Sequence, residues 1–182
     1  EWAVRQLGRA NAPDLLIVGA QKAGTTSLFH YLHDVPGFAG AQRKEIRFFS
    51  NASNYSRGVS WYEKFFMGRS SDVHFEATPE YLYDPRVPAR IRSQYPNARI
   101  VIVLREPVER AYSAWNMYRS WADKVFVPLV MHQSRKGNPL YELFFSGSPP
   151  SFEEYVSYET ALMQREHPAL EVGLRQQDRQ VP

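Results

Sequence analysis

Cysteine is absent from the 182 residues of this chain, and so is any apolar run long enough to cross a membrane. The first absence excludes disulfide bonds and thiolate metal sites. The second leaves no helix of about 18 apolar residues, and the opening EWAVRQLGRANAP lacks the apolar segment of a signal peptide. Excess positive charge is also small, because the net charge of +3 is much lower than that of typical nucleic-acid-binding proteins. We therefore expect no nucleic-acid partner and no membrane segment in this chain, so that any anchor lies outside it.

The composition that remains is that of a globular protein, with 43% hydrophobic and 14% aromatic residues. A chain of this length can form one domain with a sizeable core and is short for two. We expect an N-terminal extension over residues 1–12 and one domain over residues 13–182. No pattern in the sequence indicates an oligomeric state.

The stretch LLIVGAQKAGTTSL places a glycine-rich turn between an apolar run and a helical pattern. Gly19 and Gly24 have the spacing of the triphosphatase loop G-x-x-x-x-G-K-[ST], but Lys22 lies inside the turn instead of after the second glycine. Backbone N–H groups at a helix N-terminus bind anions, and Lys22 with the hydroxyls of Thr25 and Thr26 can contact the same anion. The displaced lysine predicts a site that relies on organic cations rather than on a metal. The alternative is a tight turn with an exposed lysine.

Three short apolar runs bounded by turn residues are typical of buried strands, and a helical pattern follows each of them. The expected strands span residues 14–20, 73–78 and 98–105, and the expected helices span residues 25–35, 88–95 and 108–122. This alternation predicts an α/β fold with a P-loop-type parallel sheet flanked by helices on both faces. Ligands of such sheets bind beyond the carboxyl ends of the strands.

Two details of this fold follow from the pattern. Leu28, Tyr31 and Leu32 are expected to form the apolar face of the first helix, and Ser151 is expected to cap a helix over residues 151–166. Three strands are few for a doubly wound sheet, so we expect part of the fold to lie beyond Pro182.

A second candidate feature is the segment IVLREPVERAYSAW. Arg105 ends the third strand, where its guanidinium can bind a phosphate through two hydrogen bonds. Ser113 follows eight residues later on the next helix. The alternative is that Arg105 pairs with Glu106 or Glu109 in a surface network.

Together these segments resemble the sulfotransferases that use 3′-phosphoadenosine 5′-phosphosulfate (PAPS). QKAGTTSL is similar to their 5′-phosphosulfate loop, and LREPVERAYSAW is similar to their 3′-phosphate segment. Between them, KEIRFFSNASNYSRGVSWYEKFF resembles the heparan sulfate and related Golgi-type carbohydrate sulfotransferases, with a Glu before an aromatic pair and then Tyr-x-x-Gly-x-x-Trp-Tyr. The resemblance covers residues 13–121.

The resemblance implies roles for individual residues. Glu45 would be the general base, Lys22 would stabilise the leaving phosphate, and Lys44, Arg47 and Thr78 would contact the substrate. Residues that bind the donor would be Lys22, Ala23, Gly24, Thr25, Thr26 and Ser27 at the 5′-phosphosulfate and Arg105 and Ser113 at the 3′-phosphate. PAPS would be the donor, adenosine 3′,5′-bisphosphate (PAP) the product, and no metal would be required. The acceptor would be a hydroxyl group, most simply on a carbohydrate.

Two groups of residues also have purely structural interpretations. Lys44 and Glu45 can form a solvated ion pair on a loop. An aromatic set that follows them is expected to belong to the core rather than to a sugar-stacking platform. This set consists of Trp61, Tyr62, Phe65 and Phe66.

The chain departs from the family pattern at three places. Arg47 stands where heparan-type enzymes often have histidine, and Ala77 stands where several glycosaminoglycan enzymes have lysine. The lost lysine argues against a polyanionic acceptor but leaves donor binding untouched. The family also continues beyond the point at which this chain ends.

Two other functions compete with the sulfotransferase. A P-loop kinase would need a lysine after Gly24 and a magnesium-binding aspartate, and neither is evident. A truncated, inactive module that binds PAPS or PAP would keep the donor loop alone. The sequons at Asn51 and Asn54 fit N-glycosylation or chance, and with the resemblance they lead us to expect the Golgi lumen, or the cytoplasm if the protein is bacterial.

Overall fold

The computed structural model describes residues 12–69, 72–122, 143–144 and 148–166. The chain divides into two compact units, Glu1–Glu106 and Pro107–Pro182. The first unit holds a sheet with helices on both faces, and the described part of the second unit is helical.

A parallel sheet forms the centre of the first unit. Its strands are β1 (Leu15–Gly19), β2 (Phe38–Gly40), β3 (Val73–Ala77) and β4 (Arg99–Ile102). Their order is β2-β3-β1-β4, and every neighbouring pair is parallel. The three predicted strands are therefore confirmed. β2 was not predicted, because three residues are too few to show a periodic pattern, and pairing with β3 defines this strand.

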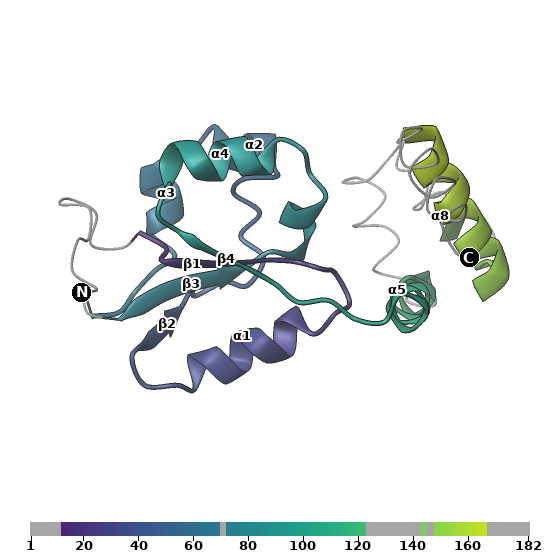
Figure 1. The fold of residues 1–182 in the computed structure, drawn as a ribbon, viewed down its shortest axis with the longest axis horizontal. Coiled ribbons are helices and arrows are strands. Elements are labelled where there is room, and N and C mark those ends of the chain that lie inside the picture. The colour runs from purple at the N-terminus through teal and green to yellow at the C-terminus, as the bar shows by residue number, and fades with distance from the viewer. Residues whose placement is uncertain (1–11, 70–71, 123–142, 145–147, 167–182) are drawn as a thin grey trace, which may run out of the picture. The chain divides into compact units, whose positions relative to one another are not determined.

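Helices cover both faces of this sheet, as Figure 1 shows with α1 below the strands and α2, α3 and α4 above them. The bounds are α1 (Thr25–His33), α2 (Ala52–Tyr55), α3 (Val59–Glu63), the 3₁₀ helix η1 (Pro79–Leu82) and α4 (Val87–Gln94). The arrangement confirms the predicted α/β class.

The apolar face of α1 differs from the prediction at one residue. Leu28 and Leu32 pack against the core as expected, but Tyr31 is 70% exposed. Phe29 is the buried aromatic residue instead and packs on Phe75, with ring centroids 5.2 Å apart. At 3.6 residues per turn, Tyr31 lies about 120° around the helix from the centre of the face that contacts the sheet.

On the opposite face of the sheet lies a larger, aromatic-rich cluster. Tyr62 and Phe66 are fully buried in it, and Trp61 and Phe65 pack against it. The Phe48 ring stacks on Tyr62 with centroids 4.4 Å apart. The predicted core role of this aromatic set is thereby confirmed, and its contact with Phe48 fixes the segment that follows Glu45.

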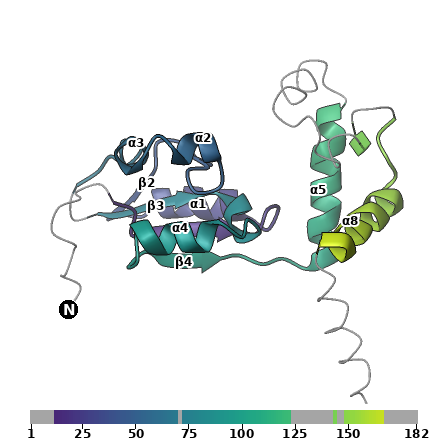
Figure 2. The ribbon, with the colours of Figure 1, turned by 90° about the horizontal axis from the view of Figure 1, so that it is seen from above.

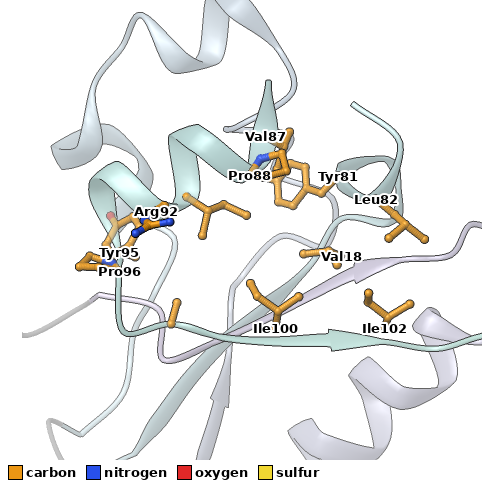
Figure 3. Close-up of a pocket in the computed structure, with 12 residues that line it drawn as sticks. Val18, Tyr81, Leu82, Val87, Pro88, Arg92, Tyr95, Pro96, Ile100 and Ile102 are labelled. Carbon is orange, nitrogen blue, oxygen red and sulfur yellow. The ribbon is translucent and has the colours of Figure 1, made fainter. Parts of the chain in front are cut away.

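An apolar hollow of about 330 Å³ lies between α4 and the strands β1 and β4. Figure 3 shows Val18, Ile100 and Ile102 of the sheet facing Val87 and Pro88 of the helix. Hydrocarbon dominates this lining, which therefore does not suit a phosphate or sulfate group.

The described part of the second unit contains α5 (Pro107–Ala122) and α8 (Phe152–Glu166), which contact each other (Figure 2). The Glu154 N–H donates to Ser151 Oγ at 3.2 Å, and the Ser151 N–H donates to the Glu154 carboxylate at 2.7 Å. This reciprocal capping box confirms the predicted start of the helix. Residues 1–11 of the expected N-terminal extension lie outside the described residues. Among the described residues, none of the helices is long and apolar enough to cross a membrane.

Candidate active site

Loops from several strands meet at the carboxyl edge of the sheet, as the parallel order requires. The Ala20 N–H donates to Val103 O at 2.8 Å, which joins the segments that follow β1 and β4. The Glu45 N–H donates to Ala77 O at 3.0 Å, which joins the segment after β2 to the end of β3. The predicted donor loop and the predicted base therefore occupy the same edge.

The donor loop leads directly into α1. Gly24 has φ of 102° and provides the left-handed residue that starts the helix. No side chain caps the first turn of α1, and that turn contains no acidic residue. Thr25 is buried, while Thr26 and Ser27 are exposed. The loop thus presents backbone N–H groups, hydroxyls and the half-buried Lys22 to an anion, which fits the phosphosulfate expected there.

Glu45 lies between two cations. Lys44 Nζ is 3.0 Å from Oε1, and an Arg47 guanidinium nitrogen is 3.2 Å from Oε2. Arg47 Nε also lies 3.4 Å from a carboxylate oxygen of Glu80. Burial acts to raise the pKa of Glu45, but the hydrogen bonds and charges of Lys44 and Arg47 outweigh it, so the pKa lies below the ordinary value. The carboxylate is consequently ionised at neutral pH and can accept a proton.

The backbone has an unusual conformation at three of the predicted site residues. Among the described residues other than glycine, positive φ occurs at Lys22 (67°), Glu45 (59°) and Arg47 (57°). A side chain in this conformation costs of order 1–3 kcal/mol, and such residues gather at functional sites. All three are predicted site residues, and their roles stay predictions.

A solvent-open hollow of about 430 Å³ borders Glu45 and is lined by Arg43, Lys44, Glu45 and Arg47. Arg43 is a candidate substrate contact that was not predicted from the sequence. The only available signal was the clustering of cations in QRKEIR, which also fits an ordinary surface. Arg43, Lys44 and Arg47 outnumber the carboxylates of Glu45 and Glu80, which leaves a small excess of positive charge beside this hollow.

Thr78 follows β3 and does not line this hollow. It is fully buried, its hydroxyl donates to Glu76 at 2.8 Å, and the Arg47 N–H approaches that hydroxyl at 3.5 Å. The structure thus places it behind the Glu45 segment, and its contact with substrate stays a prediction.

Arg105 and Ser113 fall in different units, since the chain divides after Glu106. Arg105 is exposed at the end of the first unit, and Ser113 lies on α5 of the second. Their joint binding of the 3′-phosphate stays a prediction.

No group of three or more His, Cys, Asp or Glu side chains that could hold a metal occurs within the described ranges. The expectation that no metal is required stays a prediction.

Comparison with known proteins adds to this geometry. A family model described as "Sulfotransferase domain" matches residues 12–167. The "Membrane-associated sulfotransferase kil1" of Dictyostelium discoideum is 35% identical over 113 residues, which cover 60% of this chain and 24% of that protein. The human "Bifunctional heparan sulfate N-deacetylase/N-sulfotransferase 1" is 34% identical over 129 residues, which cover 66% of this chain and 14% of that protein. This chain therefore spans only a minor part of the length of these relatives.

A solved structure has a similar fold. The crystal structure of a sulfotransferase from Alicyclobacillus acidocaldarius matches with a TM-score of 0.55 and 24% identity, covering 86% of this chain and 80% of that one. At this identity the match concerns the fold alone.

Proposed function

Because this chain belongs to the sulfotransferase family, we propose that it transfers a sulfuryl group from PAPS to a carbohydrate acceptor. The observation that carries the proposal is the left-handed backbone of Lys22 and Glu45 at one edge of the sheet. One residue lies in an anion-binding turn, and the other presents an ionised carboxylate. Sulfuryl transfer needs these two groups together.

The donor side uses the turn between β1 and α1. PAPS, when bound, supplies the sulfuryl group, and the backbone N–H groups at the start of α1 hold its anionic oxygens. Lys22 neutralises the charge that develops on the bridging oxygen, and the hydroxyls of Thr26 and Ser27 add donors. Arg105 and Ser113 are proposed to hold the 3′-phosphate, where the guanidinium can form two parallel hydrogen bonds.

On the acceptor side, Glu45 removes the proton from the attacking group. The acceptor atom forms its bond to sulfur, the bond from sulfur to the bridging phosphate oxygen breaks, and PAP leaves. The proton resides on the Glu45 carboxyl group until solvent takes it. Lys44 and Arg47 keep this carboxylate ionised before the reaction, since each lies within 3.2 Å of one of its oxygens.

The hollow beside Glu45 supports an acidic carbohydrate as the acceptor. Ala77 contributes no cation and is buried in the core cluster that also contains Ile17 and Phe29. Arg43, Lys44 and Arg47 supply positive charge from a different segment, which Glu45 and Glu80 offset in part, and the remaining charge can attract carboxylate or sulfate groups of a sugar chain. The names of several relatives specify N-sulfotransferases of heparan sulfate. An amine is therefore a candidate acceptor beside the hydroxyl.

Calorimetry on the full chain tests the donor assignment. We expect PAP to bind in the absence of metal and ATP to bind more weakly, because Lys22 and the uncapped turn of α1 are arranged for an anion, and Gly24 is followed by Thr25 instead of the lysine of the triphosphatase loop. Tighter, magnesium-dependent ATP binding would instead favour a nucleotide kinase.

Transfer of ³⁵S-labelled sulfate from PAPS to N-desulfated heparin, chondroitin and neutral lactose then tests the acceptor. PAP binding without transfer to any of these would favour an inactive binding module.

The two sequons support a lumenal location, for which we propose the Golgi. Asn51 is exposed at the start of α2, whereas the Asn54 side-chain nitrogen donates to Ile46 O at 3.0 Å. On expression through a secretory pathway, we expect a glycan at Asn51 in preference to Asn54. Asn51→Gln should remove most of the mass shift that peptide N-glycosidase reverses, and Asn54→Gln should remove little. An unmodified wild-type protein would argue against lumenal passage.

A further inference from the structure

Glu76 on β3 is a fully buried carboxylate that the proposed reaction does not use. Tyr62 Oη donates to it at 2.6 Å, Thr78 Oγ1 at 2.8 Å and Tyr81 Oη at 2.9 Å. The backbone N–H of Ile46 donates to the same carboxyl group. Burial of a carboxylate costs free energy unless several hydrogen-bond donors satisfy it. The four neutral donors around Glu76 therefore offset this cost, and they indicate that the side chain has a structural role.

These bonds lead to the segment that carries Glu45. Ile46 is bonded to the carboxylate directly, and the Arg47 N–H reaches it through the Thr78 hydroxyl at 3.5 Å. The Phe49 N–H donates to Tyr81 Oη at 3.3 Å, and that hydroxyl donates to Glu76. Three backbone N–H groups between residues 46 and 49 therefore end, directly or through one hydroxyl, on a single carboxyl group.

The segment held in this way has no regular secondary structure of its own. Residues 41–47 lie outside the helices and strands, and both Glu45 and Arg47 have positive φ. Such a backbone persists only where surrounding contacts determine it. The Glu45 N–H bond to Ala77 O and the Gln42 N–H bond to Phe65 O are two of these contacts, and the network around Glu76 supplies further ones.

We infer that Glu76 is a positioning residue for the acceptor side of the site, which holds the Glu45 carboxylate in place through the backbone of residues 46–49. This inference rests on the proposed role of Glu45. Glu76 itself does not contact substrate, because it is fully buried among Tyr62, Thr78 and Tyr81. Burial raises its pKa, and the donors from Tyr62, Thr78, Tyr81 and Ile46 oppose that shift.

Glu76→Gln tests the inference, because the amide keeps the size of the side chain but replaces one acceptor oxygen with a donor. We expect turnover of ³⁵S-labelled sulfate onto the best acceptor of the panel to fall about tenfold or more, the equivalent of one unsatisfied buried group. The PAP dissociation constant should not change. Glu63→Gln is the matched control. The Glu63 carboxylate also accepts a hydrogen bond from a tyrosine, Tyr95, and that bond does not involve the segment that carries Glu45.

Trypsin supplies a readout that does not depend on activity. Cleavage after Lys44 and Arg47, measured by mass spectrometry relative to cleavage after the exposed Arg57, reports the order of this segment alone. We expect the relative rate to rise about tenfold in Glu76→Gln and to stay unchanged in Glu63→Gln. Normal turnover and an unchanged relative rate in Glu76→Gln would overturn the inference. A parallel loss of PAP binding and turnover would overturn it too, because it would indicate a general role in folding.

A pair of tyrosine variants keeps the test decisive if Glu76→Gln does not fold. Tyr62→Phe and Tyr81→Phe each remove one hydroxyl that donates to Glu76, but only the Tyr81 hydroxyl also accepts from the Phe49 N–H. Faster cleavage after Arg47 is expected in Tyr81→Phe alone, and equal effects would count against the inference. If Glu45→Gln retains full turnover, the proposed base is wrong, while the proteolysis still reports whether Glu76 orders the segment.

Discussion

Glu45→Gln is expected to lower turnover by about 10²–10⁴-fold, the usual contribution of general base catalysis. The amide cannot take a proton from the acceptor, yet it keeps the size of the side chain and a hydrogen-bonding oxygen for Lys44. Binding of PAP should not change, because the donor loop contacts a different part of the edge. Initial rates of ³⁵S transfer at saturating PAPS, with PAP calorimetry on the same sample, measure both quantities.

Glu63→Gln serves as the control here as well. Full turnover in Glu45→Gln would exclude Glu45 as the base.

The pH dependence of kcat/KM adds a second check. Protonation of the base removes activity as the pH falls through its pKa, and Lys44 and Arg47 hold that pKa below the ordinary glutamate value. The acid limb of kcat/KM should therefore lie at lower pH than for an ordinary glutamate.

Lys22→Ala is expected to weaken PAP binding and also to lower kcat. A charge-assisted contact contributes about 1.5–3 kcal/mol, equivalent to roughly 10- to 150-fold in the dissociation constant. The loss in kcat follows from the proposed place of Lys22 at the leaving oxygen, where negative charge increases in the transition state. Calorimetry with PAP and rates at saturating PAPS separate the two effects.

Three further variants control this experiment. Lys64→Ala removes an exposed lysine next to α3 and should change neither quantity. Lys22→Gly removes the charge and also relieves the positive φ of 67°, so it should bind PAP as weakly as Lys22→Ala if charge decides. Arg105→Ala should weaken PAP binding without the loss in kcat. Unchanged PAP binding in Lys22→Ala would rule out its proposed contact with the donor.

Local patterns predicted much of the first unit. β1, β3 and β4 were visible as short apolar runs, and α1 and α4 as the helical patterns that follow two of them. Each of these signals lies within a few neighbouring residues, which is why one sequence contains it. The donor turn was recognisable for the same reason, since two glycines and a lysine at fixed spacing lie in one stretch of chain.

Features that depend on distant partners could not be predicted in this way. β2 exists because β3 lies beside it, and Tyr31 turned out exposed because the sheet contacts a face centred elsewhere on α1. Arg43 lines the hollow because the folded backbone of the Glu45 segment brings it beside Lys44, Glu45 and Arg47.

Sequence patterns alone were enough to predict β1, β3 and β4, the helices that follow them and the anion-binding turn with Lys22, and the family resemblance added Glu45 as a candidate. The way in which Glu45 is held became visible only in the folded chain. Tyr62 and Tyr81 lie 14 and 5 residues from Glu76 along the chain, and Ile46 lies on another segment altogether. Hydrogen bonds of this kind depend on which segments the sheet brings together, and no periodicity or spacing encodes them.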